Sequence, residues 1–140
     1  MKKVIILVCV VFGLLSCTKP SFEFVELTYP DGTPQVVKYY KTEEMKVLLK
    51  KIEYHENGQK RIEGSYKNGK RDGEWTAWFA NGNLWSKGYY TEGVENGMKT
   101  VWHENGQKYY EGPIVNDERT GTWKFWNEEG KLVKEVDYGD

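Results

Sequence analysis

The chain repeats itself every 24 residues, and this period constrains the possible fold more than any other feature of the sequence. Four series of positions keep the spacing: the turn glycines Gly58, Gly82, Gly106 and Gly130, the aromatic residues Tyr54, Trp78, Trp102 and Trp126, the mid-unit glycines Gly64, Gly88 and Gly112, and the later glycines Gly73, Gly97 and Gly121. Such agreement indicates tandem copies of one small unit, each packing against its neighbours. We therefore expect an array rather than a domain built around one pocket.

The sequence of each 24-residue unit predicts two short antiparallel strands. Asn57-Gly58 and Asn68-Gly69 are hairpin signals in the first unit, because both residue types tolerate a positive φ. The runs between such signals alternate apolar and polar side chains, as strands do. The predicted strands of the repeats are 60–66, 74–79, 84–90, 99–103, 108–114, 122–126 and 132–138. We expect an all-β fold, an elongated single-layer antiparallel sheet of stacked 24-residue β-hairpin repeats.

The first seventeen residues predict export and lipid attachment. Lys2 and Lys3 precede twelve largely apolar residues, and this run is too short for a membrane-spanning helix, which needs about 20. Residues 14–17 read LLSC and resemble the lipobox of bacterial lipoproteins, which implies cleavage before Cys17 and its acylation. The alternative is an ordinary cleaved signal followed by a stray cysteine. A lipid on Cys17 would make the membrane a partner and place the protein in the cell envelope. Thr18 is not the aspartate of an inner-membrane retention signal, which favours the outer membrane.

The sequence divides into four segments. Residues 1–16 predict a lipoprotein signal peptide, 17–21 a short tether, 22–53 an irregular N-terminal β cap and 54–140 the hairpin repeats. In the cap, strands are expected at 22–29, 35–40 and 47–54. The stretch at 42–49 is also compatible with a short helix, because it combines good helix formers with an apolar run.

Composition argues against nucleic acid as a partner and against a fold held by a disulfide. Without Lys2 and Lys3 the mature chain carries 18 basic and 21 acidic side chains, a formal charge of −3. Lysines alternate with glutamates along the repeats instead of forming the basic stripe that binds phosphates. Cys9 leaves with the signal, so Cys17 is the only cysteine of the mature chain.

The first unit carries a characteristic motif. Residues 57–60 read NGQK and residues 64–75 read GSYKNGKRDGEW. This pattern resembles the variant MORN repeat of bacterial proteins that are often named YwqK-family antitoxins, and the resemblance covers about residues 54–138. It implies a β-hairpin repeat fold and, through the family name, an antitoxin or immunity-type protein that neutralises a toxin by direct binding.

Two positions depart from this repeat pattern. Lys99 stands where Trp75 and Trp123 stand in the neighbouring units, and Pro113 lies inside a predicted strand. Because proline removes one donor of the strand ladder, we expect it to interrupt that strand. The second and third units are therefore expected to pair imperfectly.

Side-chain alternation sorts the predicted strands into an apolar structural face and a second face with an aromatic ladder. This ladder is expected near the Asn-Gly turns, with Trp78 opposite Trp85 across one turn, and its members are the candidate binding residues Trp78, Trp85, Trp102, Tyr109 and Trp126. The ladder either holds a thin sheet together or, because one layer cannot bury both faces, stays partly exposed and binds a partner. The Trp102→Ala substitution separates these readings: a core tryptophan would cost about 3–5 kcal/mol, and an exposed one very little.

No motif for catalysis, metal binding or cofactor binding occurs in the sequence. His55 and His103 lie two periods apart at the same turn position, without the further ligands that a zinc site needs. Glu63, Glu111 and Glu135 predict a charged, solvated strip rather than an acid–base pair in a pocket. We therefore expect no enzyme, no metal and no cofactor. The leading hypothesis is a non-enzymatic, lipid-anchored envelope repeat protein that binds a protein, glycan or lipid, and the alternative is an antitoxin or immunity-type protein.

Overall fold

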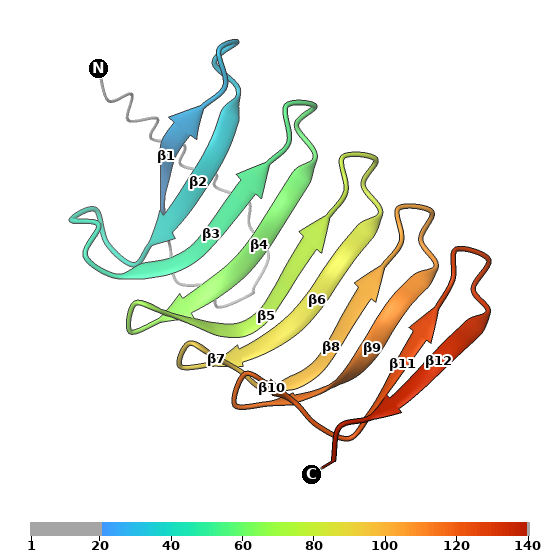
Figure 1. The fold of residues 1–140 in the computed structure, drawn as a ribbon. Helices are drawn as coiled ribbons and strands as arrows, with labels where there is room; N and C mark the ends of the chain where they lie inside the picture. Colours follow the sequence, from blue (N-terminus) through green and yellow to red (C-terminus); the bar gives the residue numbers. More distant parts are fainter. Residues whose placement is uncertain (1–20, 140) are drawn as a thin grey trace, which may run out of the picture.

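Residues 21–139 are described by the computed structural model, and they form one open antiparallel sheet (Figure 1). The strands are β1 (Phe22–Thr28), β2 (Pro34–Tyr40), β3 (Leu48–Tyr54), β4 (Lys60–Lys67), β5 (Lys70–Trp78), β6 (Leu84–Thr91), β7 (Val94–Glu95), β8 (Gly97–Trp102), β9 (Lys108–Val115), β10 (Glu118–Arg119), β11 (Thr122–Trp126) and β12 (Leu132–Asp137). The expected all-β fold is confirmed. The signal peptide predicted at 1–16 and the lipidation site predicted at Cys17 lie outside the described residues.

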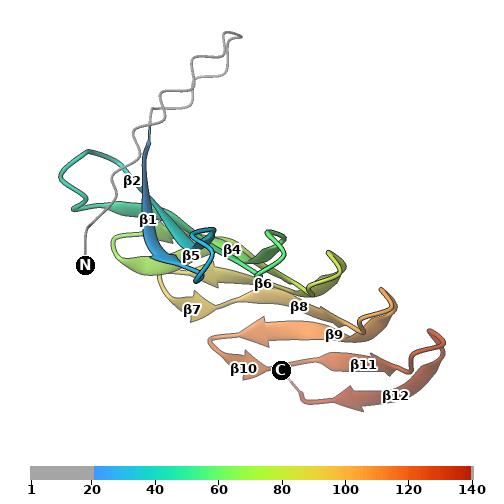
Figure 2. The same ribbon diagram turned by 90° about the horizontal axis from the view of Figure 1, so that it is seen from above.

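Strands that follow one another in the sequence are neighbours in the sheet. The order is β1-β2-β3-β4-β5-β6-β8-β9-β11-β12, and the two-residue strands β7 and β10 pair with β6 and β9 beside this path. Figure 2 shows the sheet from above as a single twisted layer. Within residues 21–139, no helix is long and apolar enough to cross a membrane. The elongated, single-layer arrangement therefore follows the order of the repeats.

The turns at the two ends of the strands differ in conformation. We call the end with the turns after β1, β3, β5, β8 and β11 the Asn-Gly end. There Gly58 has a φ of 79° and its N–H donates to the carbonyl of His55 at 2.9 Å, whereas Asn57 keeps a negative φ. At the opposite end, Asn68 and Gly69 have φ values of 51° and 76°. The expectation that both residues of an Asn-Gly pair take a positive φ therefore holds only for the second kind of turn.

One alternative left open by the sequence is decided in favour of the strand, and one local expectation is wrong. The helix considered at 42–49 does not form, and β3 begins at Leu48 after a loop. Pro113 does not interrupt its strand, because β9 continues through it in register with Met98 of β8. Pairing is weaker at two other places. β6 and β8 share only two residue pairs, and so do β9 and β11. At these places the short strands β7 and β10 pair with β6 and β9 instead.

One face of the sheet holds most of the core and is called the core face. Its buried side chains in the repeats are Trp75, Ala77, Val101, Ile114 and Trp123. We call the other face the charged face. Its buried positions lie in the N-terminal strands, at Val37 and Ile52, which pair with each other. A single layer therefore buries apolar side chains only where neighbouring side chains cover them.

Glycine makes room for the two large rings of the core face. Trp75 lies over Gly64 and Trp123 over Gly112, and in both cases a Cβ on the glycine would overlap the indole. Each indole N–H donates to a backbone carbonyl, Trp75 to Ser65 at 3.2 Å and Trp123 at 3.0 Å to the residue after Gly112. Gly64 and Gly112, two of the three mid-unit glycines, therefore leave the space that a tryptophan ring occupies.

The middle unit replaces this arrangement by an ion pair. Arg71 lies over Trp75 with its guanidinium carbon 4.3 Å from the ring centroid, and the unit containing Trp123 has the same stacking. One period after Arg71 and Trp75, the chain has Glu95 and Lys99, whose side chains form an ion pair at 2.8 Å. The departure at Lys99 therefore comes with a second, compensating change at Glu95.

Candidate functional site

The five candidate aromatic residues do not form one strip. Trp78, Trp102 and Trp126 lie half-buried on the charged face. Lysine side chains cover two of them: the Nζ of Lys60 lies 5.9 Å from the ring centroid of Trp78, and another lysine lies 5.5 Å from that of Trp126. The rings of Trp78 and Trp126 therefore support cationic side chains.

The other two candidates, Trp85 and Tyr109, are the extra residues of β-bulges. Trp78 pairs with Leu84 and Ala77 with Ser86, which leaves Trp85 without a partner on β5. The same register shift leaves Tyr109 unpaired between β8 and β9. The predicted pairing of Trp78 with Trp85 is therefore wrong. A bulge inserts one residue and changes the face to which the next side chain points.

Both bulge residues join the core face. The ring of Tyr109 lies 5.1 Å from that of Tyr110, which packs against Trp123 at 5.7 Å. Trp85 borders a hollow together with Trp75. The exposed fractions are 47% for Trp85 and 46% for Tyr109, among the larger values for aromatic side chains here.

Each bulge residue is supported by the first residue of the preceding turn. Trp85 contacts Phe79 with ring centroids 6.1 Å apart, and Tyr109 contacts His103 at 4.7 Å. Because these pairs are one 24-residue period apart, they form a column along the Asn-Gly end of the core face. We call Phe79, Trp85, His103 and Tyr109 the aromatic column.

Below Trp85 the core face is hollowed. The hollow measures about 140 Å³ and is lined by Ile62, Arg71, Trp75, Thr76, Ala77, Trp85, Ser86, Tyr90 and Lys99. Its lining combines apolar and aromatic surface with two cationic side chains. Enclosed ligand pockets usually measure about 300–1,000 Å³, so the hollow is too small for a substrate pocket of the ordinary kind.

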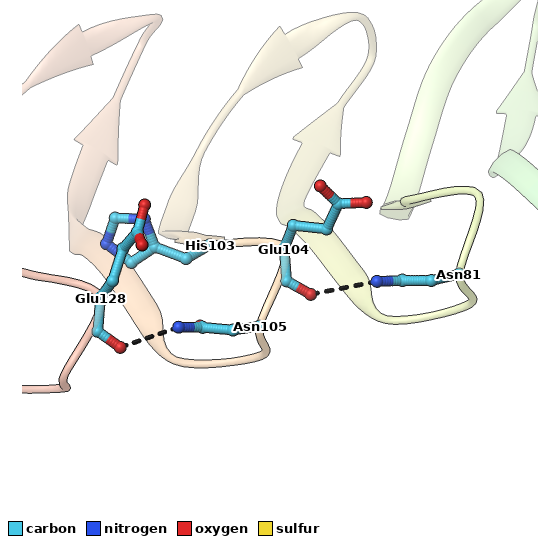
Figure 3. Close-up of a pocket in the computed structure, with 5 residues that line it drawn as sticks. All are labelled: Asn81, His103, Glu104, Asn105 and Glu128. Carbon is cyan, nitrogen blue, oxygen red and sulfur yellow. Dashed lines mark hydrogen bonds between the residues drawn. The ribbon is translucent and has the colours of Figure 1, made fainter.

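The turns of the Asn-Gly end are joined by a ladder of asparagine side chains. Figure 3 shows two of its steps, in which Asn81 donates to the carbonyl of Glu104 at 3.2 Å and Asn105 donates to that of Glu128 at 2.8 Å. These residues and His103 line an open depression. The amide groups are already used by the neighbouring turns, so the depression serves to hold successive units together.

The histidines have the same structural role. Nε2 of His55 lies 2.9 Å from the carbonyl oxygen of Trp78, and Nε2 of His103 lies 3.0 Å from that of Trp126. Each ring nitrogen therefore donates to the next hairpin. Across residues 21–139, no three side chains of His, Cys, Asp or Glu are grouped so that they could hold a metal ion.

Ion pairs run across the charged face. They are Lys50–Glu63, Lys60–Glu63, Lys87–Glu74, Lys108–Glu111 and Lys124–Glu135. Burial raises the pKa of Glu63, but hydrogen bonds from Lys50 and Lys60 outweigh it and bring the pKa of this carboxyl below its ordinary value. Glu63 is therefore held as the ionised partner of two lysines, and the row of ion pairs agrees with the predicted charged strip.

Sequence reasoning named Trp85 and the departure at Lys99 but missed Ser86 and the hollow that these residues line. Ser86 takes the place that Ile62 and Tyr110 have in the neighbouring units, and Lys99 takes the place of a tryptophan. Alignment of the repeats shows this small residue in a series of larger ones, which is a signal for an unfilled space. The repeat alignment does not show the bulge that places Trp85 beside this hollow.

Comparison with protein families identifies the repeat. The family model for the MORN repeat variant matches residues 50–68, 71–92 and 119–140, so this repeat is detected three times in the chain. The segment between the second and third matches contains both departures, Lys99 and Pro113. A comparison with curated proteins gives no match.

Among solved structures, the chain is similar to one described as "Glycosylation Associate Protein (Gap123) complex from Streptococcus agalactiae". The sequence identity is 19%, the TM-score is 0.42, and the similarity covers 74% of this chain. The chain covers 20% of that solved chain.

Proposed function

We propose that the protein is a non-enzymatic repeat module of the cell envelope, anchored by a lipid on Cys17, that binds a partner through the aromatic column. The observation that carries the proposal is the pair of bulges that leave Trp85 and Tyr109 about half exposed on the face that buries Trp75 and Trp123. Large aromatic side chains of this kind dominate the binding energy of protein interfaces.

The dimensions of the sheet favour an extended partner. Equivalent side chains in successive units are separated by two strand spacings, about 9–10 Å. A strand-like polypeptide or another linear chain could therefore contact Trp85 and Tyr109 at once. An enzymatic role has no support in the hollow, because it is small and no carboxylate or histidine is among the residues that line it.

The double substitution of Trp85 and Tyr109 by alanine is expected to weaken partner binding at least tenfold, because each exposed ring contributes contact area but little folding energy. Binding of the mature chain to immobilised envelope proteins, glycans and lipid vesicles measures the effect. Trp126→Ala, on the charged face, is the matched control and should retain binding. Equal binding by the double variant, with an unchanged thermal midpoint, would contradict the proposal.

The lipid anchor has a separate test. Cys17→Ala is expected to move the protein out of the membrane fraction, because one cysteine carries the predicted acyl groups and at least two chains are needed for stable attachment. Fractionation with a carbonate wash measures the change, and the wild-type chain is the control. A Cys17→Ala protein that still resists carbonate would show that the attachment has another cause.

The antitoxin or immunity role remains the alternative and would use the same aromatic column. It differs in the nature of the partner, which would be a toxin reaching the cell from outside. A captured partner that is toxic to cells lacking this protein, encoded next to its gene, would favour that alternative.

A further inference from the structure

The repeats allow one site to be compared with its own filled counterpart. Tyr110 lies on the core face between Val101 and Phe125, and its ring packs 5.7 Å from that of Trp123 and 5.9 Å from that of Phe125. One period earlier, Ser86 lies between Ala77 and Val101 in the same register. The hollow at Ser86 is therefore the space that an aromatic ring occupies in the following unit.

The size of the hollow agrees with this comparison. It measures about 140 Å³, and an apolar cavity of about 150 Å³ in another protein holds one benzene molecule. One ring therefore fills the space, and a larger ligand would have to extend into solvent. The neighbouring exposed Trp85 gives a second surface for such a ring.

Two cationic side chains line the hollow, and they indicate which chemical group would accompany the ring of a ligand. Arg71 lies over Trp75, and within residues 21–139 the structure gives it no ion pair with a carboxylate. Its equivalent, Arg119, is occupied instead, because it donates to the hydroxyl of Tyr138 at 3.0 Å. Lys99 also lines the hollow, and its ammonium is already paired with Glu95 at 2.8 Å. An arginine with free N–H groups beside an apolar hollow suits a carboxylate.

We propose that this hollow binds an aromatic side chain of a partner protein that has a carboxylate next to it in the partner's sequence. The inference rests on the proposed function and names the part of the partner that the aromatic column holds. The ring takes the place equivalent to that of Tyr110, between Trp75 and Lys99, and the carboxylate contacts Arg71.

The test uses 4-hydroxyphenylacetate, a small probe with one ring and one carboxylate, added to the mature ¹⁵N-labelled chain with Cys17→Ser. The indole N–H signals of Trp75 and Trp85 are expected to shift with saturation, while that of Trp123, at the filled site, does not. Ser86→Tyr should weaken probe binding at least tenfold, because the chain then fills its own hollow. Thr122→Tyr, which adds a tyrosine at an exposed position of the charged face away from the hollow, is the control and should leave binding unchanged.

A second variant keeps the test decisive if Ser86→Tyr does not fold. Arg71→Gln should lower the affinity for 4-hydroxyphenylacetate at least fivefold and leave the binding of the uncharged 4-methylphenol unchanged. The inference is overturned if no saturable shift occurs, or if Trp123 shifts equally. It is also overturned if folded Ser86→Tyr protein binds the partner as wild type does while the Trp85 and Tyr109 double variant does not. That last result would leave the proposed function standing.

Discussion

Trp123→Ala is expected to be the most destabilising single substitution in the sheet, at about 3–5 kcal/mol. Trp123 is only 1% exposed, and its indole N–H donates to the carbonyl of Pro113 at 3.0 Å. Its ring also carries the guanidinium of Arg119 at 4.4 Å and packs against Tyr138 at 6.2 Å. Removing the ring empties the space over Gly112 and leaves these groups without a partner. Since small domains have about 5–15 kcal/mol of stability, the loss is a large part of the total.

Urea unfolding followed by circular dichroism measures this loss. Trp85→Ala is the matched control, because it removes the same side chain from a position that is 47% exposed. We expect the control to lose less than about 1 kcal/mol, as surface substitutions usually do. Similar losses for the two variants would show that the core of the third unit does not depend on its buried tryptophan.

Gly64→Ala is expected to cost about 1–3 kcal/mol through overpacking, although it adds a single methyl group. The new Cβ would overlap the indole of Trp75, which is fixed by its hydrogen bond to Ser65 and by the stacked Arg71. The indole of Trp75 has to move away from residue 64, so that its burial and its hydrogen bond are lost together.

Gly88→Ala provides the comparison at the equivalent position of the middle unit. There the added methyl would meet the carboxylate of Glu95 and the side chain of Lys99, which can swing into solvent. We expect a loss of less than about 1 kcal/mol, measured as the shift of the urea midpoint at constant slope. Equal losses of unfolding free energy at Gly64 and Gly88 would contradict the interpretation that Gly64 leaves space for a tryptophan ring.

Much of the fold was predictable because it depends on local patterns. The 24-residue period and the alternation of side chains identified the strands of the repeats within a few residues. For example, 84–90 was predicted where β6 runs from Leu84 to Thr91, and 122–126 agrees with β11. The turn glycines mark the ends of these strands, since a positive φ costs least at glycine.

The candidate site was predicted less well, because its faces depend on register. Alternation places Trp78 and Trp85 on one face only if the strand has no extra residue. The structure has a bulge at Trp85 and another at Tyr109, so these rings join the core face while Trp78 and Trp102 stay on the charged face. The alternation of side chains does not show where a strand contains an extra residue, nor which of two neighbouring residues is the extra one. The two bulges could therefore not be predicted from the sequence.

The sequence by itself determined the period, the order of the hairpins and the apolar residues of the core face, because each follows from the chemistry of one unit repeated along the chain. The tertiary structure decided what lies between the units. It stacked Arg71 on Trp75, paired Glu95 with Lys99, and left a ring-sized hollow at Ser86 beneath Trp85. These features join side chains from different strands, and their positions depend on the twist and register of the assembled sheet, which no single unit contains.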